Sequence, residues 1–142
     1  MDDFEEIEAH KAKGLIDEGG QPMVNLELLK GIPNIVILQG DVIGGGAPTK
    51  EALEEMKRQG FTTVVDLRTL MEGTPFMKQS VKKLGMHYYN IPIQGSNIGE
   101  EQVNQLSEIL AAAGSRPVLI HCAVGGRVTA LWKRYQAKPT QP

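Results

Sequence analysis

From residue 35 onward, apolar residues follow two alternating patterns. Short runs rich in Val, Ile and Leu predict strands, and segments whose apolar residues repeat at helical spacing lie between them. Strands are predicted at 35–38 and 42–43, which form a hairpin, and at 61–67, 87–93 and 117–120; helices are predicted at about 49–60, 75–84, 99–113 and 126–136. Because strands alternate with helices, the pattern predicts βαβ crossovers and a mainly parallel sheet.

The chain before this pattern is different in character. Residues 1–34 are expected to form an N-terminal extension and residues 35–142 a single domain. The extension begins with charged residues, and we expect a helix at about 3–13 and a helical turn at 25–30. Gly44-Gly45-Gly46-Ala47-Pro48 is predicted to be a loop, and it lacks the Lys-Ser/Thr that follows the glycines of a P-loop.

Composition excludes several classes of function. The chain has 142 residues, a net charge of −2 and no basic stripe, so we expect no nucleic-acid partner. Its apolar runs are too short to span a membrane, and the acidic start MDDFEEIEAHK is not a secretory signal, so we expect a cytoplasmic protein without membrane partners. One cysteine excludes an internal disulfide, and no ligand spacing indicates a metal. The oligomeric state is not determined by these features.

The segment that carries the chemistry runs from Val118 to Thr129. An apolar strand leads directly into His121-Cys122-Ala-Val-Gly125-Gly126-Arg127, and a helix follows. The two glycines allow the loop to curl so that backbone N–H groups converge, and the helix N-terminus adds partial positive charge. An anion fits such a concavity, and Arg127 can bind two of its oxygens. The segment therefore predicts an anion-binding loop.

Cys122 stands at the start of this loop, where the same field favours a thiolate and makes the sulfur a competent nucleophile. His121 is expected to orient the loop through its imidazole. A lone Cys at the end of a buried strand is often only a small apolar core residue. The Gly-Gly-Arg that follows favours the active-site interpretation, because a core strand does not need an arginine at that place.

The HCxxGxR pattern at 121–127 resembles the active-site loop of the small bacterial beta-lactamase hydrolase-like phosphatases, a branch of the cysteine-dependent protein tyrosine and dual-specificity phosphatases. The similarity covers residues 35–136. GAPT at 46–49 is similar to that family's GQPS, GFTTVVDLR at 60–68 to its G-x-x-x-V-I-x-L-R strand, GMHYYNIPI at 85–93 to its G-x-x-Y-x-x-I-P-V strand, and RVTALW at 127–132 to the start of its final helix.

The resemblance implies a three-layer α/β fold of the protein tyrosine phosphatase type, with a central, mainly parallel sheet flanked by helices. It also implies two chemical steps, in which Cys122 attacks phosphorus to give a phosphocysteine and water then releases phosphate. The expected ligand is a phosphorylated substrate or a small oxyanion such as phosphate or sulfate, and no cofactor is implied. The phosphoryl oxygens would be held by Arg127 and by the backbone of Ala123, Val124, Gly125 and Gly126.

Arg68 ends the strand at 61–67 and is expected near the loop. It could lend a second positive charge to bound substrate, or it could form an ion pair or a cap between loops. Glu72, four residues later, could brace Arg68 or Arg127.

Three features depart from the tyrosine phosphatase pattern. Four residues separate Cys122 from Arg127, where tyrosine phosphatases typically have five. Val128 follows the arginine, where those enzymes usually carry a Ser or Thr that stabilises the leaving thiolate, and Thr129 comes one residue later. The loop at 94–99, which in the family supplies an aspartic general acid, contains no Asp.

Glu100 and Glu101 are the carboxylates nearest to that loop, and they are candidate general acids. Acidic residues in the first turn of a helix also suit the helix dipole, without any catalytic role. Loss of a general acid lowers rates on the order of 10²–10⁴-fold. We therefore expect weak activity on activated aryl phosphates and little on phosphoserine.

Two other functions remain open. Rhodanese sulfurtransferases share the four-residue spacing, and Asp66-Leu67-Arg68 is similar to their D-x-R; Cys122 would then carry a persulfide. A non-catalytic module that binds anions or phosphoproteins would also fit, because both the Asp and the hydroxyl after Arg127 are missing.

Overall fold

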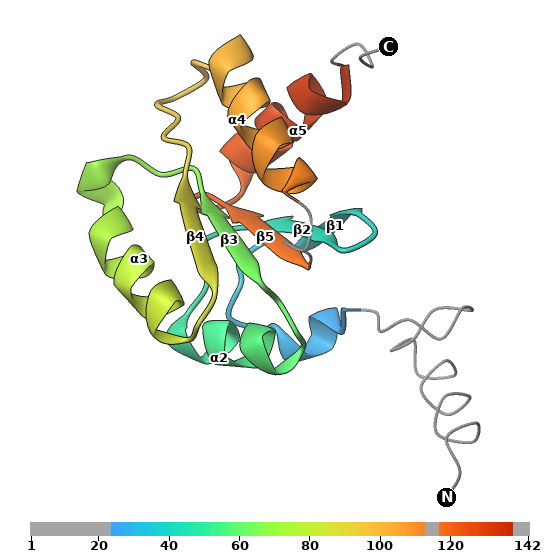
Figure 1. The fold of residues 1–142 in the computed structure, drawn as a ribbon, viewed down its shortest axis with the longest axis vertical. Coiled ribbons are helices and arrows are strands. Elements are labelled where there is room, and N and C mark those ends of the chain that lie inside the picture. Colours follow the sequence, from blue (N-terminus) through green and yellow to red (C-terminus); the bar gives the residue numbers. More distant parts are fainter. Residues whose placement is uncertain (1–23, 113–116, 138–142) are drawn as a thin grey trace, which may run out of the picture.

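The computed structural model describes residues 24–112 and 117–137. Within them, a five-stranded sheet has the order β1-β2-β5-β3-β4 (Figure 1). The strands are β1 (Val36–Gln39), β2 (Val42–Gly45), β3 (Thr63–Asp66), β4 (His87–Asn90) and β5 (Val118–His121). The helices are α2 (Lys50–Arg58), α3 (Thr74–Lys83), α4 (Glu100–Ala111) and α5 (Gly126–Ala137), with short 3-10 turns η1 (Leu26–Leu28) and η2 (Leu70–Glu72).

The sheet is mainly parallel, as the alternating pattern predicts. Strand β1 pairs with β2 in an antiparallel hairpin, and the pairs β2–β5, β5–β3 and β3–β4 are all parallel. Each parallel connection passes through a helix, because a parallel partner cannot be reached by a tight turn. The predicted hairpin and helices are confirmed; the helix expected at 3–13 lies outside the described residues.

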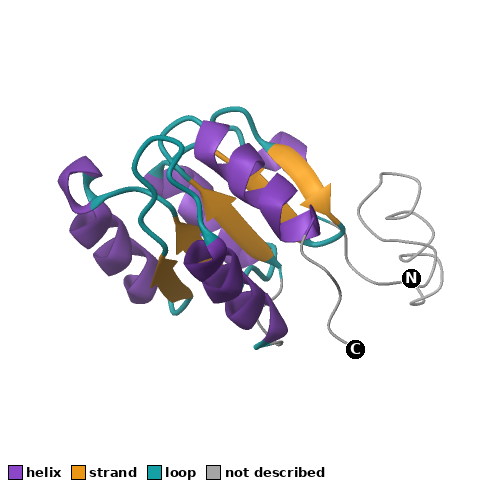
Figure 2. Ribbon diagram, turned by 90° about the horizontal axis from the view of Figure 1, so that it is seen from above, coloured by secondary structure: helices purple, strands orange, loops and turns teal. Residues whose placement is uncertain are grey.

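Helices cover both faces of the sheet, with α2 and α3 on one side and α4 and α5 on the other (Figures 1 and 2). Successive side chains of a strand point to opposite faces. In β3, Val64 accordingly packs in the core with α2 and α3, whereas Val65 packs in the core with α4 and α5. This three-layer α/β arrangement is the fold class that the sequence predicts.

The glycine-rich segment corrects one prediction. Gly44 and Gly45 are not in a loop but end β2, where they pair with Ile120 and His121. A Cβ on Gly45 would lie only 2.7 Å from the Cγ2 of Ile32. The glycines therefore serve close packing of the strand rather than a turn. The strand predicted at 87–93 is also shorter, since β4 ends at Asn90.

The described part of the N-terminal extension packs on the domain. Leu29 and Ile32 are buried in the core beside α2 and α3. The expected helical turn at 25–30 is present as η1, and its N-cap Asn25 accepts a backbone hydrogen bond from Glu27. No helix among the described residues has the length and apolar character needed to cross a membrane.

Candidate active site

Three polar residues form a row at the carboxyl end of the parallel strands. Asp66 pairs with His121 in register, and Asn90 pairs with Asp66 on the other side. Neighbouring strands lie about 4.8 Å apart, so side chains of paired residues are adjacent on one face. The loops after β3, β4 and β5 leave from this edge, which is where ligands bind in such sheets.

These three loops contact one another. The Leu67 N–H donates to the His121 carbonyl at 2.8 Å, and the Ile93 N–H donates to the Leu67 carbonyl at 3.0 Å. Arg127 then donates to the Ile93 carbonyl at 3.0 Å. The site is thus assembled from segments that lie up to sixty residues apart in the chain.

Cys122 lies directly after β5, and its side chain is turned into the loop. Its sulfur accepts a hydrogen bond from the Gly125 N–H at 2.9 Å, and the residue is only 1% exposed. Gly125 has φ of +115°, a conformation that favours glycine. Helix α5 starts at the next residue, so the sulfur faces both a backbone N–H and a helix N-terminus.

The loop backbone is held from outside by residues far away in the sequence. The Ala47 N–H donates to the Ala123 carbonyl at 3.1 Å, and Asn34 Nδ2 donates to the Val124 carbonyl at 2.7 Å. In a trans peptide the carbonyl and the following N–H point in opposite directions. The N–H groups of Val124 and Gly125 therefore point inward, as the bond from Gly125 to the Cys122 sulfur shows.

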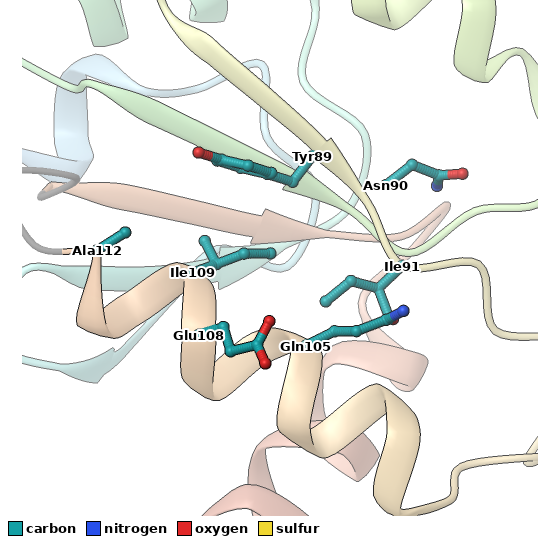
Figure 3. A pocket seen from close by; sticks show the side chains of 7 residues that line it. All are labelled: Tyr89, Asn90, Ile91, Gln105, Glu108, Ile109 and Ala112. Atoms are coloured by element: carbon teal, nitrogen blue, oxygen red, sulfur yellow. The ribbon is translucent and has the colours of Figure 1, made fainter.

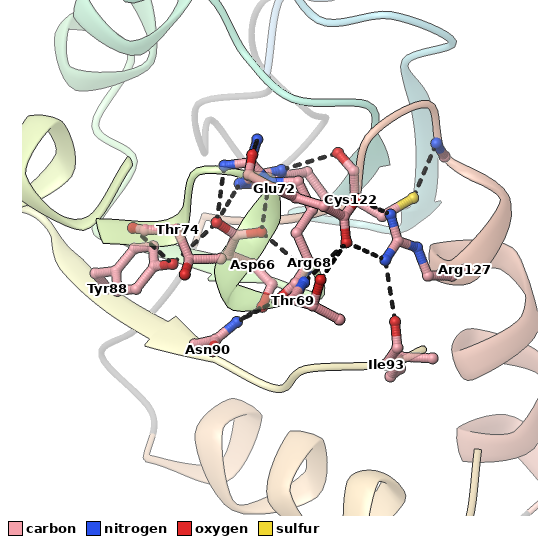
Figure 4. A network of polar contacts seen from close by, with 12 residues as sticks. Asp66, Arg68, Thr69, Glu72, Thr74, Tyr88, Asn90, Ile93, Cys122 and Arg127 are labelled. Carbon is pink, nitrogen blue, oxygen red and sulfur yellow. Dashed lines mark hydrogen bonds and ion pairs between the residues drawn. The ribbon is translucent and has the colours of Figure 1, made fainter. Parts of the chain in front are cut away.

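Arg127 is braced at the mouth of the loop by Glu72 (Figure 4). Its Nη1 and Nη2 donate to the two carboxylate oxygens at 2.8 and 2.7 Å, and Nη1 also donates to the Ile93 carbonyl. A guanidinium has five N–H donors, so two of them, the Nε–H and one Nη2–H, are not used by Glu72 or Ile93. These two form a fork that suits two oxygens of a phosphate.

The ion pair between Glu72 and Arg127 shifts the pKa of both side chains. Hydrogen bonds from Arg127 lower the pKa of Glu72 to about 2. Hydrogen bonds to Glu72, and in smaller part the adjacent Cys122, raise the pKa of Arg127. The arginine is thus a permanent cation beside the sulfur.

His121 is fully buried beneath the loop. Its Nδ1 lies 3.1 Å from the Cys122 carbonyl oxygen. Because a carbonyl only accepts hydrogen bonds, Nδ1 must carry the proton in this contact. Burial lowers the pKa of His121, so the imidazole is neutral. Its Nε2 has no hydrogen-bond partner among the described residues and faces Asp66 Oδ2 at 3.8 Å.

Arg68 forms the ion pair that the sequence offered as the alternative to substrate contact. Its Nε and Nη2 donate to the two oxygens of Asp66, each at 3.0 Å, and its Nη1 donates to the Glu72 carbonyl at 3.1 Å. The residue is buried. Burial raises the pKa of Asp66, but the hydrogen bonds from Arg68 outweigh it, so the carboxyl pKa is lowered. Arg68 is the ion-pair residue of the alternative interpretation.

The remaining candidates lie outside the loop interior. Val128 is buried in the core, and the Thr129 hydroxyl donates to the Gly125 carbonyl at 3.4 Å rather than to the sulfur. Glu100 and Glu101 are exposed in the first turn of α4. Their roles as general acids stay predictions.

Sequence reasoning missed two polar residues of the site. The Tyr88 hydroxyl donates to Asp66 Oδ2 at 2.9 Å, and Asn90 Nδ2 donates to the carbonyls of Asp66 and Arg68 at 2.7 and 2.9 Å. Their alternation along HYYN could have indicated one shared face. Only the register of β4 against β3 places that face next to Asp66.

A separate surface pocket of about 340 Å³ lies between β4 and α4 (Figure 3). It contains none of the predicted site residues, and it is lined by Tyr89, Asn90, Ile91, Gln105, Glu108, Ile109 and Ala112. Across residues 24–112 and 117–137, no group of three or more His, Cys, Asp or Glu side chains could hold a metal ion.

The fold and the loop together define a cysteine-dependent phosphatase-type domain of the dual-specificity class. More particularly, the chain belongs to the family described as "PTP-NADK: DSP-PTPase phosphatase fused to NAD+ Kinase", which matches residues 38–141. NAD kinase 2, chloroplastic, of Arabidopsis thaliana is 31% identical over 104 residues, which make up 67% of this chain and 11% of that protein. The chain spans about a tenth of the length of the curated relatives it matches.

Solved structures share the fold. A DUF442 protein from Shewanella putrefaciens CN-32, a candidate phosphatase, is 24% identical with a TM-score of 0.71, over 79% of this chain and 76% of that chain. The core catalytic domain of the PP-IP phosphatase SIW14 from S. cerevisiae, crystallised with citrate, is 23% identical with a TM-score of 0.54, over 71% and 64% of the two chains.

Proposed function

We propose that this domain hydrolyses phosphate monoesters through a phosphocysteine on Cys122. The observation that supports this most directly is the relation between the sulfur and the cation. Cys122 accepts a hydrogen bond from Gly125, and Arg127 is held beside it with two N–H donors that neither Glu72 nor Ile93 uses. A tetrahedral phosphate placed over the loop would meet inward N–H groups, the arginine fork and the nucleophile together.

Each residue then has a role that its contacts support. The Cys122 thiolate attacks phosphorus, the bond to the leaving oxygen breaks, and the leaving group departs with that electron pair. Water next attacks the phosphocysteine, which releases inorganic phosphate and returns the thiolate. The Arg127 fork and the N–H groups of the loop stabilise the negative charge on the equatorial oxygens in both steps. The buried imidazole of His121 holds the carbonyl at the base of the loop.

Turnover is expected to be slow for esters with poor leaving groups. The loop at 94–99 has no Asp, and Glu72, the carboxylate seen to contact Arg127, is occupied by that arginine. Without an acid to protonate the leaving oxygen, activated aryl phosphates should react best.

Exposed apolar residues that are near Glu72 in the sequence also support an aryl substrate. Met71 is 93% exposed, and Phe76 at the start of α3 is 77% exposed. Large exposed apolar side chains near a site favour contact with an apolar part of a ligand. Together with two arginines that are each paired with a carboxylate, they favour a monophosphate on an apolar or aromatic group over a highly charged polyphosphate.

The decisive test compares the protein with a Cys122→Ser variant, using an aryl phosphate and, separately, thiosulfate plus cyanide. Phosphate release that depends on Cys122 would support the proposal. Thiocyanate formation would support the sulfurtransferase alternative, which the four-residue spacing favours. No turnover with either substrate, together with retained phosphate binding, would support a non-catalytic anion-binding module. Thr129→Ala is the control, because its hydroxyl lies on the loop without reaching the sulfur.

Two finer points belong to the same proposal. The HCxxGxR loop supports a relationship to the bacterial beta-lactamase hydrolase-like phosphatases. A cytoplasmic location, without nucleic-acid or membrane partners, stays an expectation from composition.

A further inference from the structure

Asp66 is a buried carboxylate at the end of β3 that accepts several hydrogen bonds. Its oxygens accept hydrogen bonds from the Arg68 backbone N–H, Nε and Nη2, each at 3.0 Å, and from the Tyr88 hydroxyl at 2.9 Å. Its side chain is 0% exposed. An ionised group so deeply buried is stable only when its oxygens are saturated in this way.

From Asp66, a chain of contacts leads to the cation of the loop (Figure 4). Arg68 uses its third nitrogen, Nη1, on the Glu72 carbonyl at 3.1 Å. The Glu72 carboxylate is fixed at its base by Thr69, whose N–H and hydroxyl donate to Oε1 at 2.9 and 3.0 Å. That carboxylate then accepts from both Nη atoms of Arg127. Asp66 thus orients Arg127 through two intermediate residues.

The other side of Asp66 faces the base of the nucleophile. Asp66 and His121 are paired residues of β3 and β5, so their side chains lie on one face. Oδ2 lies 3.8 Å from Nε2 of His121, and the opposite ring nitrogen contacts the Cys122 carbonyl. Asp66 is thus adjacent to the imidazole that contacts the Cys122 carbonyl, without a hydrogen bond between the carboxylate and Nε2.

We propose that Asp66 and Arg68 are positioning residues that hold Arg127, through Glu72, in the geometry that binds the anion. The inference rests on the anion-binding loop of the proposed function. It does not require turnover, so it can be tested even if the domain hydrolyses nothing.

The test uses two readouts on Asp66→Asn and Arg68→Lys. The first is the affinity for inorganic phosphate by calorimetry, and the second is the rate of Cys122 alkylation by iodoacetamide as a function of pH. Removing the Asp66 charge makes the site more positive, which alone would tighten phosphate binding and shift alkylation to lower pH. Lost positioning has the opposite effect on phosphate affinity and on alkylation, because the Arg127 guanidinium is displaced from the anion and from the sulfur.

We expect the phosphate dissociation constant to rise about tenfold in both variants, which is about the size of one charged hydrogen bond. We also expect alkylation of Asp66→Asn to shift to higher pH. Arg68→Lys keeps the charge beside Asp66 but cannot reach the Glu72 carbonyl at the same time. If Asp66→Asn does not fold, Arg68→Lys alone still tests whether these contacts position Arg127.

A control variant separates positioning from stability alone. Thr63→Val changes a buried polar residue at the other end of β3, away from the site. It should change phosphate affinity less than about twofold. Folded Asp66→Asn and Arg68→Lys proteins whose phosphate affinity equals or exceeds that of the wild type would overturn the proposal.

Discussion

The carboxylate of Glu72 binds both terminal nitrogens of Arg127, at 2.8 and 2.7 Å. The two residues are 55 positions apart in the chain. Glu72 belongs to the short turn η2, which is closed by a capping box between Thr69 and Glu72. A local turn thus presents a carboxylate that orients the arginine of the loop, and the contact does not use the Nε–H edge of the guanidinium.

Glu72→Gln tests whether this contact positions Arg127. We expect kcat for an aryl phosphate to fall about 10- to 100-fold, since a charged, bidentate contact is replaced by a single neutral one. Phosphate binding should weaken too, although the variant is less negative. The control is Glu55→Gln, which breaks the ion pair with Arg58 on α2, away from the loop. Equal effects of the two variants on kcat would contradict the prediction.

The same pair predicts a dependence of stability on pH. The folded-state pKa of Glu72 is about 2, below its ordinary value of 4.5. Because the pKa is depressed by folding, the stabilisation is fully present above pH 4.5 and is lost as the pH falls toward 2. In urea unfolding, the difference in free energy between wild type and Arg127→Met should shrink across this window. A constant difference down to about pH 2 would show that the pair does not titrate there.

Gly125 and Gly126 offer a matched pair of substitutions. Gly125 has φ of +115°, so Gly125→Ala should cost roughly 1–3 kcal/mol and move the N–H away from the Cys122 sulfur. At Gly126 an added Cβ meets nothing within 4 Å, so Gly126→Ala should be tolerated. Chemical denaturation and the rate of Cys122 alkylation measure the two effects. Alkylation that is unchanged in Gly125→Ala would argue against a role for this N–H.

Whether Glu100 or Glu101 acts as the general acid can be tested by varying the leaving group of the substrate. Both are exposed in the first turn of α4, where they complement the helix dipole. If neither is a general acid, the double variant Glu100→Gln/Glu101→Gln should leave kcat unchanged for good and poor leaving groups alike. In the wild type, kcat should fall steeply as the leaving group becomes more basic. A loss of about a hundredfold or more, confined to poor leaving groups, would identify one of them as the acid.

The helices and strands could be predicted from the sequence because the residues that mark their ends lie within or next to them. Thr49 and Gly60 mark the two ends of α2, and Thr49 indeed accepts a hydrogen bond from the Ala52 N–H at 3.1 Å. Gly44 and Gly45 misled the local interpretation, since glycine signals a turn unless close packing requires it. The packing partner of Gly45, Ile32, lies on a segment that no pattern connected to β2.

The sequence alone determined the anion-binding loop, because nucleophile, glycines and arginine lie within six consecutive positions, Cys122 to Arg127, and their spacing fixes what a curled backbone can do. The tertiary structure alone decided how that loop is supported. Strand register places Asp66 beside His121, and the turn after β3 brings Glu72 to Arg127. The tertiary structure also brings Arg68 into an ion pair with the buried Asp66, one of the two interpretations that its position in the sequence left open. Such pairings arise from contacts between distant segments, for which the chain carries no local signal.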